Sequence, residues 1–275
     1  MVEGSTSSGA ALLPVTIVTG FLGSGKTTLL NHLLTNQTGR RIGALVNEFG
    51  AVDVDSSLLA SAGTISDGIV ELANGCICCT INESLCDAVS NLLTQRAKID
   101  YLLLETTGVA DPGPVLQTLL LPQFASYLRV DGIVTMIDGI SMARALSKLA
   151  ASPPAPDLET SLWKQKDSSG VQLTPHEELL CFSRQLDAAD ILVISKVDLL
   201  TVADVRALHT ELGHRAPNAR VLQCEHGALP PEVVLSQPRY DAASRGDELF
   251  APKDSFSSMN VPAFASHYKC ALRVQ

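Results

Sequence analysis

The stretch "PVTIVTGFLGSGKTTLLNHLL", residues 14–34, decides the fold. Its β-branched opening is typical of a buried strand, and "TTLLNHLL" at its end follows a helical pattern. Between them, "GFLGSGKT" (Gly20 to Thr27) satisfies the G-x-x-x-x-G-K-[ST] pattern of a phosphate-binding loop. Its glycines let backbone N–H groups turn toward a phosphate at a helix N-terminus, Lys26 can reach the β- and γ-oxygens, and the Thr27 hydroxyl suits Mg²⁺. The pattern therefore predicts a nucleotide site formed by Gly20, Gly23, Ser24, Gly25, Lys26, Thr27 and Thr28.

The rest of the chain repeats this alternation of strand and helix. Continuous apolar runs, typical of strands buried on both faces of a sheet, lie at 14–20, 42–47, 101–107, 130–138, 189–196 and 220–224. Amphipathic segments that favour helices lie at 26–35, 81–97, 114–121, 141–150, 176–188 and 203–214. The order predicts an α/β fold, a three-layer P-loop NTPase domain with a mostly parallel sheet.

The predicted domain covers residues 14–230 and carries an insertion loop at 151–175, where Pro, Ser and charged residues break the pattern. Residues 1–13 are expected to form a flexible tail. Residues 231–275 are expected to form a linker and a short, incomplete C-terminal segment, because the apolar periodicity fades there.

Composition excludes several classes of function. With 29 acidic and 20 basic residues and no run of Lys or Arg, the chain has no electrostatic footprint for nucleic acid or an anionic membrane. No apolar run reaches the about 18 residues that span a bilayer, and "MVEGSTSSGA" lacks a basic signal-peptide region. A cytoplasmic location, or a nuclear one, is therefore expected. The scattered cysteines at 86, 181, 224 and 270 are interpreted as buried small hydrophobes.

Two further strand ends carry nucleotide chemistry. "YLLLETTG" ends in Glu105 and Gly108, the places of a Walker B acid and a glycine that senses the γ-phosphate. "ISKVDLL" supplies Ser195, Lys196 and Asp198. The carboxylate can accept N1–H and the exocyclic N–H of guanine, and the Lys stem can stack on the purine. Asn usually holds the first position of this loop, so the shorter Ser195 leaves the bracing of the loop open.

Cys76, Cys78 and Cys79 stand close together in "GCICCTINESL", residues 75–85. Thr80 and Glu83 fit a capping box, which places the cysteines before a helix N-terminus that favours thiolates. Three thiolates suit Zn²⁺ above Cu⁺ or Co²⁺, and the absence of a second ligand pair favours an exchangeable site. A C-x-x-C redox pair, Cys76 with Cys79, and plain packing stay open as alternatives.

Taken together, "GFLGSGKTTLLNHLL", "VNEFG" (46–50), "ELANGCICCT", "LLLETTGVADP" and "SKVDLL" resemble the CobW family of G3E P-loop GTPases. The resemblance implies a metallochaperone that couples GTP hydrolysis to delivery of zinc to a client metalloprotein. A eukaryotic branch resembles a zinc transferase for type 1 methionine aminopeptidase, but the Cys-Pro docking motif for that client is not seen here. It also implies a C-terminal family domain, which this sequence is expected to lack or to carry truncated. Oligomerisation stays open.

Carried over by position, the resemblance implies catalytic roles for Lys26, Thr27, Asp55, Glu105 and Gly108. "NEFG" with Asp55 forms the first switch, and Thr27 binds magnesium. Guanine selection falls to Lys196 and Asp198, and zinc binding to Cys76, Cys78 and Cys79. The expected cofactors are GTP or GDP, Mg²⁺ and Zn²⁺. The alternative functions are a nucleotide-binding metal buffer or regulatory scaffold without effective hydrolysis, and a P-loop small-molecule kinase.

Overall fold

The structure of the chain is a computed structural model. It describes residues 11–36, 39–46, 62–66, 69–72, 77–80, 85–108, 110–151, 165–166, 172–173, 175–235 and 240. None of the helices in these ranges combines the length and the apolar character that a bilayer span requires.

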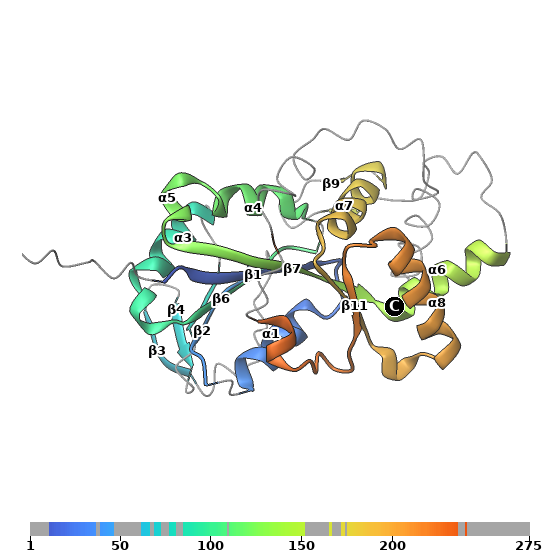
Figure 1. Ribbon diagram of the computed structural model, residues 1–275, viewed down its shortest axis with the longest axis horizontal. Helices are drawn as coiled ribbons and strands as arrows, with labels where there is room; N and C mark the ends of the chain where they lie inside the picture. Colours follow the sequence, from blue (N-terminus) through green and yellow to red (C-terminus); the bar gives the residue numbers. More distant parts are fainter. Residues whose placement is uncertain are drawn as a thin grey trace, which may run out of the picture.

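A nine-stranded sheet forms the centre of the described part of the chain, in the order β11-β10-β7-β1-β6-β2-β5-β4-β3 (Figure 1). All neighbouring pairs from β11 to β5 are parallel, whereas β4 and β3 join antiparallel at one edge. The strands are β1 (Leu13–Gly20), β2 (Ile42–Val46), β3 (Ala62–Ser66), β4 (Ile69–Leu72), β5 (Ile77–Thr80), β6 (Tyr101–Glu105), β7 (Leu128–Asp138), β10 (Ile191–Ser195) and β11 (Arg220–Gln223). A separate antiparallel pair joins β8 (Gln165–Lys166) to β9 (Gln172–Leu173).

Helices cover both faces of the sheet, with α3, α4 and α5 above it and α1 below it in Figure 1. Their bounds are α1 (Lys26–Thr35), α3 (Leu85–Thr94), α4 (Pro112–Leu119), α5 (Pro122–Ala125), α6 (Gly139–Ala151), α7 (Pro175–Ala188), α8 (Val202–Arg215) and α9 (Pro231–Val234), with 3₁₀ turns η1 (Arg96–Lys98) and η2 (Val197–Leu199). Consecutive residues of β1 serve opposite layers, since Ile17 packs with α3 and α4 while Val18 packs with α1. The predicted three-layer α/β fold with a mostly parallel sheet is thus confirmed.

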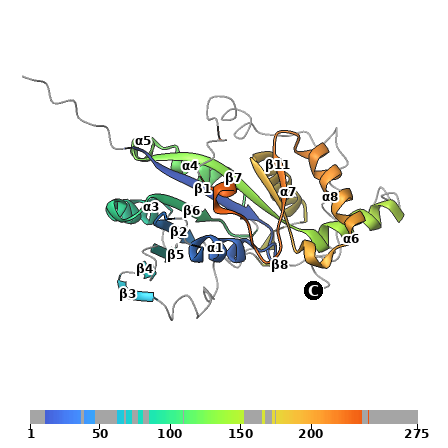
Figure 2. The same ribbon diagram turned by 60° about the horizontal axis from the view of Figure 1, so that its bottom comes forward.

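The predicted elements differ from the observed ones mainly at one edge of the sheet. The sequence analysis predicts no strand at β3, β4 or β5. The segment of β3 holds one large apolar residue, Ile65, and that of β4 is interrupted by Glu71, so neither forms a continuous apolar run. Figure 2 shows β3 and β4 at one end of the sheet. Within the described residues, the helix predicted over 81–97 is α-helical from Leu85 to Thr94 and is followed by the 3₁₀ turn η1.

The core also extends past residue 230, where the sequence predicted a linker. Val234 and Leu235 are buried in the same cluster as α1, and the backbone N–H of Tyr240 donates to Asp131 O at 3.1 Å. Residues 1–10, most of 152–174 and 241–275 lie outside the described residues.

A buried polar cluster joins β1, β6 and β7 at the end of the sheet opposite the phosphate loop. The hydroxyl of Tyr101 lies 2.8 Å from Thr16 Oγ1 and donates to Asp131 Oδ2 at 3.1 Å. Arg129 donates to the other carboxylate oxygen of Asp131 at 2.8 Å, and this hydrogen bond raises the pKa of the Arg129 guanidinium. Each buried oxygen of the cluster thus has a partner, which a buried polar group requires.

Replacing Tyr101 with Phe should destabilise the domain, because Thr16 and Asp131 would each lose a partner in the core. We expect the free energy of unfolding to fall by about 1–3 kcal/mol in urea titrations. Tyr127→Phe, at a side chain 52% exposed, is the matched control and should change it by less than about 0.5 kcal/mol. Equal effects of the two changes would contradict the structural role of the cluster.

Candidate functional site

The phosphate loop joins the end of β1 to the start of α1 through three glycines with positive φ. These are Gly20 (φ 135°), Gly23 (φ 72°) and Gly25 (φ 93°), the last being the residue before the first turn of the helix. A Cβ on Gly20 would lie 2.3 Å from Met136 O, so a side chain there would collide with β7. The backbone conformation and this close approach together explain why the loop requires glycine.

Two buried polar side chains face the inside of this loop. Lys26 is only 7% exposed, and its Nζ donates to Phe21 O at 3.1 Å. Ser24 is fully buried, and its Oγ has no hydrogen-bond partner among the described residues. A buried ammonium group and an unsatisfied hydroxyl beside a helix N-terminus fit an anionic phosphate.

A hydrogen bond ties the loop to the neighbouring strand. The hydroxyl of Thr27 donates to Glu105 Oε1 at 2.8 Å, and β6 lies next to β1 with Val18 paired to Glu105. Glu105 is buried, with 3% of its surface exposed. Hydroxyl and carboxylate oxygens are ligands that Mg²⁺ prefers, so this pair fits a magnesium ion.

The segment that follows β6 lies directly against the phosphate loop. A Cβ on Gly108 would be 2.6 Å from Leu22 N, so only glycine allows this approach. Further along, Asp111 accepts a hydrogen bond from Gly113 N at 2.8 Å and so caps α4. The structure therefore brings Gly108 beside Leu22 of the phosphate loop.

Helix α7 holds the same segment from outside, which the sequence did not predict. Gln185 Nε2 donates to Ala110 O at 3.0 Å, and Arg184 forms an ion pair with Asp111. These contacts join residues more than 70 positions apart, so no local pattern indicates them. They give α7 a direct hold on the segment after β6.

The loop of Ser195 to Asp198, which was predicted to select the base and is called the base-selecting loop below, leaves β10 beside the phosphate loop. Ser195 Oγ donates to Ile137 O at 3.1 Å, and Lys196 adopts a left-handed backbone (φ 57°) just before the turn that carries Asp198. The Cβ atom of Ser195 would lie 3.8 Å from a Cβ on Gly25. The two motifs, about 170 positions apart, therefore meet at the carboxyl ends of parallel strands.

A third loop adjoins this position and was missed by the sequence analysis, which predicted only a strand there. After β11, Cys224 N donates to Ile194 O at 2.8 Å, and His226 Nε2 lies 3.8 Å from Asp198 Oδ2. A Cβ on Gly227, whose φ is 71°, would be 2.8 Å from the Thr28 backbone. The close approach of Gly227 to α1 shows that this loop borders the site.

The scattered cysteines fit the predicted packing role unevenly. Burial raises the pKa of the Cys224 thiol, which keeps it protonated as a packing residue requires. Cys86 and Cys181 are only half-buried, and Cys270 lies outside the described residues.

The cysteine motif is described only in part. Cys78 and Cys79 lie in β5, whose backbone pairs with β2, and β2 pairs in turn with β6. Val46 of β2 is paired with both Thr80 and Glu105. Cys76, Asp55 and the "NEFG" segment lie outside the described residues. Among the described side chains, no group of three His, Cys, Asp or Glu residues could hold a metal ion.

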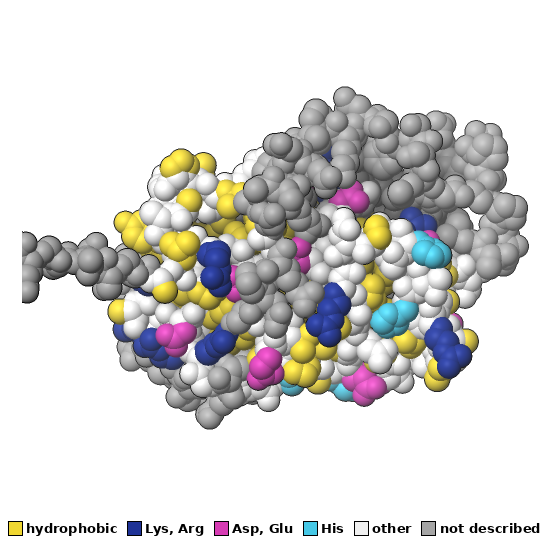
Figure 3. Space-filling view, in the orientation of Figure 1, with side chains coloured by type: hydrophobic (Ala, Val, Ile, Leu, Met, Phe, Trp, Pro, Cys, Tyr) yellow, Lys and Arg dark blue, Asp and Glu magenta, His cyan; other side chains and the backbone are white. Residues whose placement is uncertain are grey.

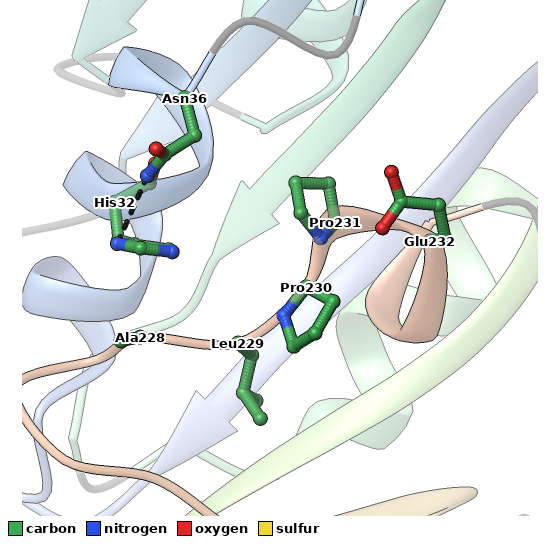
Figure 4. A pocket seen from close by; sticks show the side chains of 7 residues that line it. All are labelled: His32, Asn36, Ala228, Leu229, Pro230, Pro231 and Glu232. Carbon is green, nitrogen blue, oxygen red and sulfur yellow. Dashed lines mark hydrogen bonds between the residues drawn. The ribbon is translucent and has the colours of Figure 1, made fainter.

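A pocket of about 450 Å³ lies apart from these loops, between the last turn of α1 and the chain before α9 (Figure 4). His32 and Asn36 face Leu229, Pro230 and Glu232 across it. None of the predicted nucleotide-binding residues lines this pocket. On the face seen in Figure 3, the described Lys and Arg side chains are spread apart among acidic and apolar ones.

The phosphate loop, its Thr27–Glu105 contact and the loop carrying Asp198 define a P-loop nucleotide-binding domain with a GTPase fold. Residues 14–223 match the CobW/HypB/UreG nucleotide-binding domain, and the chain belongs to this family.

Two curated relatives share most of the chain. The zinc chaperone CobW of Pseudomonas aeruginosa is 37% identical over 232 residues, which cover 82% of this chain and 60% of the relative. The zinc-regulated GTPase metalloprotein activator 1 of Schizosaccharomyces pombe is 32% identical over 221 residues, covering 79% and 47%. This chain thus spans between about half and 60% of the length of these relatives.

A solved structure is similar as well. The Zn(II)-bound YjiA GTPase of Escherichia coli superposes with a TM-score of 0.58 and 29% sequence identity, covering 84% of this chain and 63% of that one. This similarity supports the same fold.

Replacing Gly108 with Ala should weaken nucleotide binding, because the new Cβ would push Leu22 and the phosphate loop away from β6. We expect the affinity for a fluorescent guanosine diphosphate to fall about tenfold or more, equivalent to at least about 1.4 kcal/mol. Gly213→Ala is the matched control, since a Cβ at this helical position meets no atom within 4 Å. It should leave affinity unchanged and stabilise α8 by up to about 1 kcal/mol. Unchanged affinity in both variants would contradict the assigned role of Gly108.

Proposed function

We propose that this chain is the nucleotide-driven part of a zinc chaperone that binds GTP with Mg²⁺, hydrolyses it to GDP and phosphate, and passes zinc to a client metalloprotein. The observation that carries this proposal is the hydrogen bond from Thr27 to Glu105. It joins the phosphate loop to β6, which pairs with β2, and β2 pairs in turn with β5, the strand of Cys78 and Cys79. Nucleotide site and metal motif are thereby parts of one sheet.

In the proposed hydrolysis, a water oxygen attacks the γ-phosphorus and the bond to the β–γ bridging oxygen breaks, leaving GDP and phosphate. Lys26 and the loop N–H groups stabilise the charge that develops on the phosphate oxygens. Thr27 and Glu105 would hold Mg²⁺, which would neutralise further negative charge on the phosphate oxygens. Gly108 brings its backbone to the γ-phosphate, and Asp55 acts from the first switch.

Guanine selection is proposed for Asp198, whose carboxylate accepts N1–H and the exocyclic N–H of the base. Adenine offers no such pair of donors, so the loop favours GTP over ATP. The aliphatic stem of Lys196 stacks on the purine. A clear preference for ATP in nucleotide competition would instead support the small-molecule kinase alternative.

Zinc is proposed as the cargo, held by Cys76, Cys78 and Cys79. Two relatives carry zinc in their names, and the similar YjiA structure is Zn(II)-bound. Adjacent strands lie about 4.8 Å apart, so the β5 and β6 backbones are separated by roughly 10 Å. A shift of Glu105 or Gly108 on hydrolysis can therefore reach the cysteines through one intervening strand.

The client is proposed to be a metalloprotein that receives zinc, as the name of the metalloprotein activator suggests for that relative. Methionine aminopeptidase remains one candidate client. The proposed location is the cytoplasm, where thiols stay reduced.

Replacing Lys26 with Ala should abolish hydrolysis, since the cation that faces the γ-phosphate would be lost. We expect GTP turnover to fall by at least about 100-fold, which corresponds to about 2.7 kcal/mol of transition-state stabilisation. Phosphate release from purified protein with Mg²⁺ is the measurement. Wild-type protein that releases no phosphate above background, with or without zinc, would overturn the GTPase assignment and leave the metal-buffer alternative.

Replacing Cys78 with Ser should weaken zinc binding, because a thiolate ligand would be lost. We expect at least about a 100-fold loss of zinc affinity in competition with a chelator, in line with the strength of Zn–thiolate bonds. Cys181→Ser, in α7, is the matched control and should retain wild-type affinity. The titration is repeated with GDP and with a non-hydrolysable GTP analogue; zinc affinity that is the same in both would argue against coupling.

A further inference from the structure

Asp138 is a buried carboxylate at the end of β7 that the motifs do not explain. It is 0% exposed, and its two oxygens have different partners. Oδ1 accepts a hydrogen bond from Ser141 N in the first turn of α6 at 3.0 Å, whereas Oδ2 lies 2.5 Å from Lys196 Nζ. One oxygen therefore serves the helix start and the other serves the base-selecting loop.

The base-selecting loop needs such a support because its backbone is unfavourable. Lys196 has a left-handed conformation, which costs a non-glycine residue about 1 kcal/mol or more. It directly precedes η2, so its conformation sets the direction of Asp198. An ion pair that holds the Lys196 side chain offsets part of this cost and fixes the path of the turn.

Ser195 does not provide this support, although it holds the position where Asn is usual. Its hydroxyl donates to Ile137 O at 3.1 Å, so it binds the β7 backbone one residue before Asp138. A Cβ on Gly139 would lie 2.6 Å from Ser195 O, which shows how closely the loop lies on the end of β7. The end of β7 is thus the surface on which the loop rests.

We infer that Asp138 is a positioning residue for guanine recognition, which holds the Lys196 ammonium so that the Lys stem and Asp198 meet the base. This inference deepens the proposed function and rests on it. The carboxylate acts through Lys196 and does not touch the nucleotide. In this chain the Asp138 carboxylate supports the base-selecting loop, a role that a longer side chain at position 195 would otherwise fill.

The test is Asp138→Asn in the full 275-residue chain. The Asn oxygen can still accept a hydrogen bond from Ser141 N. The second carboxylate oxygen is replaced by an uncharged NH₂ group, which donates hydrogen bonds and cannot accept one from the Lys196 ammonium group. Titration calorimetry with GDP and with ADP measures the preference for guanine. We expect GDP affinity to fall about tenfold and ADP affinity to change less than about twofold, so the preference falls about tenfold.

The matched control is Asp131→Asn, which removes the charge from another buried Asp of β7 that is also paired with a basic residue. It lies at the opposite end of the strand and should leave the preference for GDP over ADP unchanged. A second test adds Asp138→Asn to a Lys196→Met background, where it should change the preference by less than about twofold if Asp138 acts through Lys196.

Two results would overturn the inference alone: an unchanged preference in Asp138→Asn, or equal losses of GDP and ADP affinity, which indicate a merely structural role. A wild-type chain that binds GDP no better than ADP would overturn the proposed function and this inference with it. The two failures are therefore distinguishable.

Discussion

The hydrogen bond between Thr27 and Glu105 is the contact on which the site depends. It joins the first residues of α1 to the end of β6 and sets the phosphate loop against the strand whose following segment reaches Gly108. Glu105 is buried and Thr27 is half-buried, and a buried carboxylate is stable only when it is paired. The close approach of Gly20 to β7 fixes the other side of the loop. The loop is therefore held between three adjacent strands rather than by its own sequence alone.

The parallel sheet then gathers the remaining groups. Strands β1, β6, β7 and β10 are parallel, so their last residues, Gly20, Glu105, Asp138 and Ser195, all lie at the carboxyl end of the sheet. Open α/β sheets bind ligands at this carboxyl end. The same topology places the cysteine strand β5 only one strand from β6. The nucleotide-dependent movement proposed at Glu105 would therefore have a short route to the proposed metal motif, carried by backbone hydrogen bonds of one sheet.

Local patterns predicted those features whose cause is local. The strand at 14–20 and the helix at 26–35 match β1 and α1 closely, because a continuous apolar run and a helical periodicity each reflect burial of one segment. The edge strands β3 and β4 were not predicted, since neither segment forms a continuous apolar run. Residues 231–235 were predicted to be linker because the two buried residues there, Val234 and Leu235, are too few to form a pattern.

The sequence by itself determined the nucleotide motifs, the fold class and the family, because the spacing within each motif follows from the ligand it meets. Tertiary structure alone decided how the motifs are supported. The hold of Arg184 and Gln185 on the segment after β6, and that of Asp138 on Lys196, join residues between 58 and 75 positions apart. Such contacts produce no local sequence pattern, because they depend on which strands lie side by side in the sheet and so bring their carboxyl ends together.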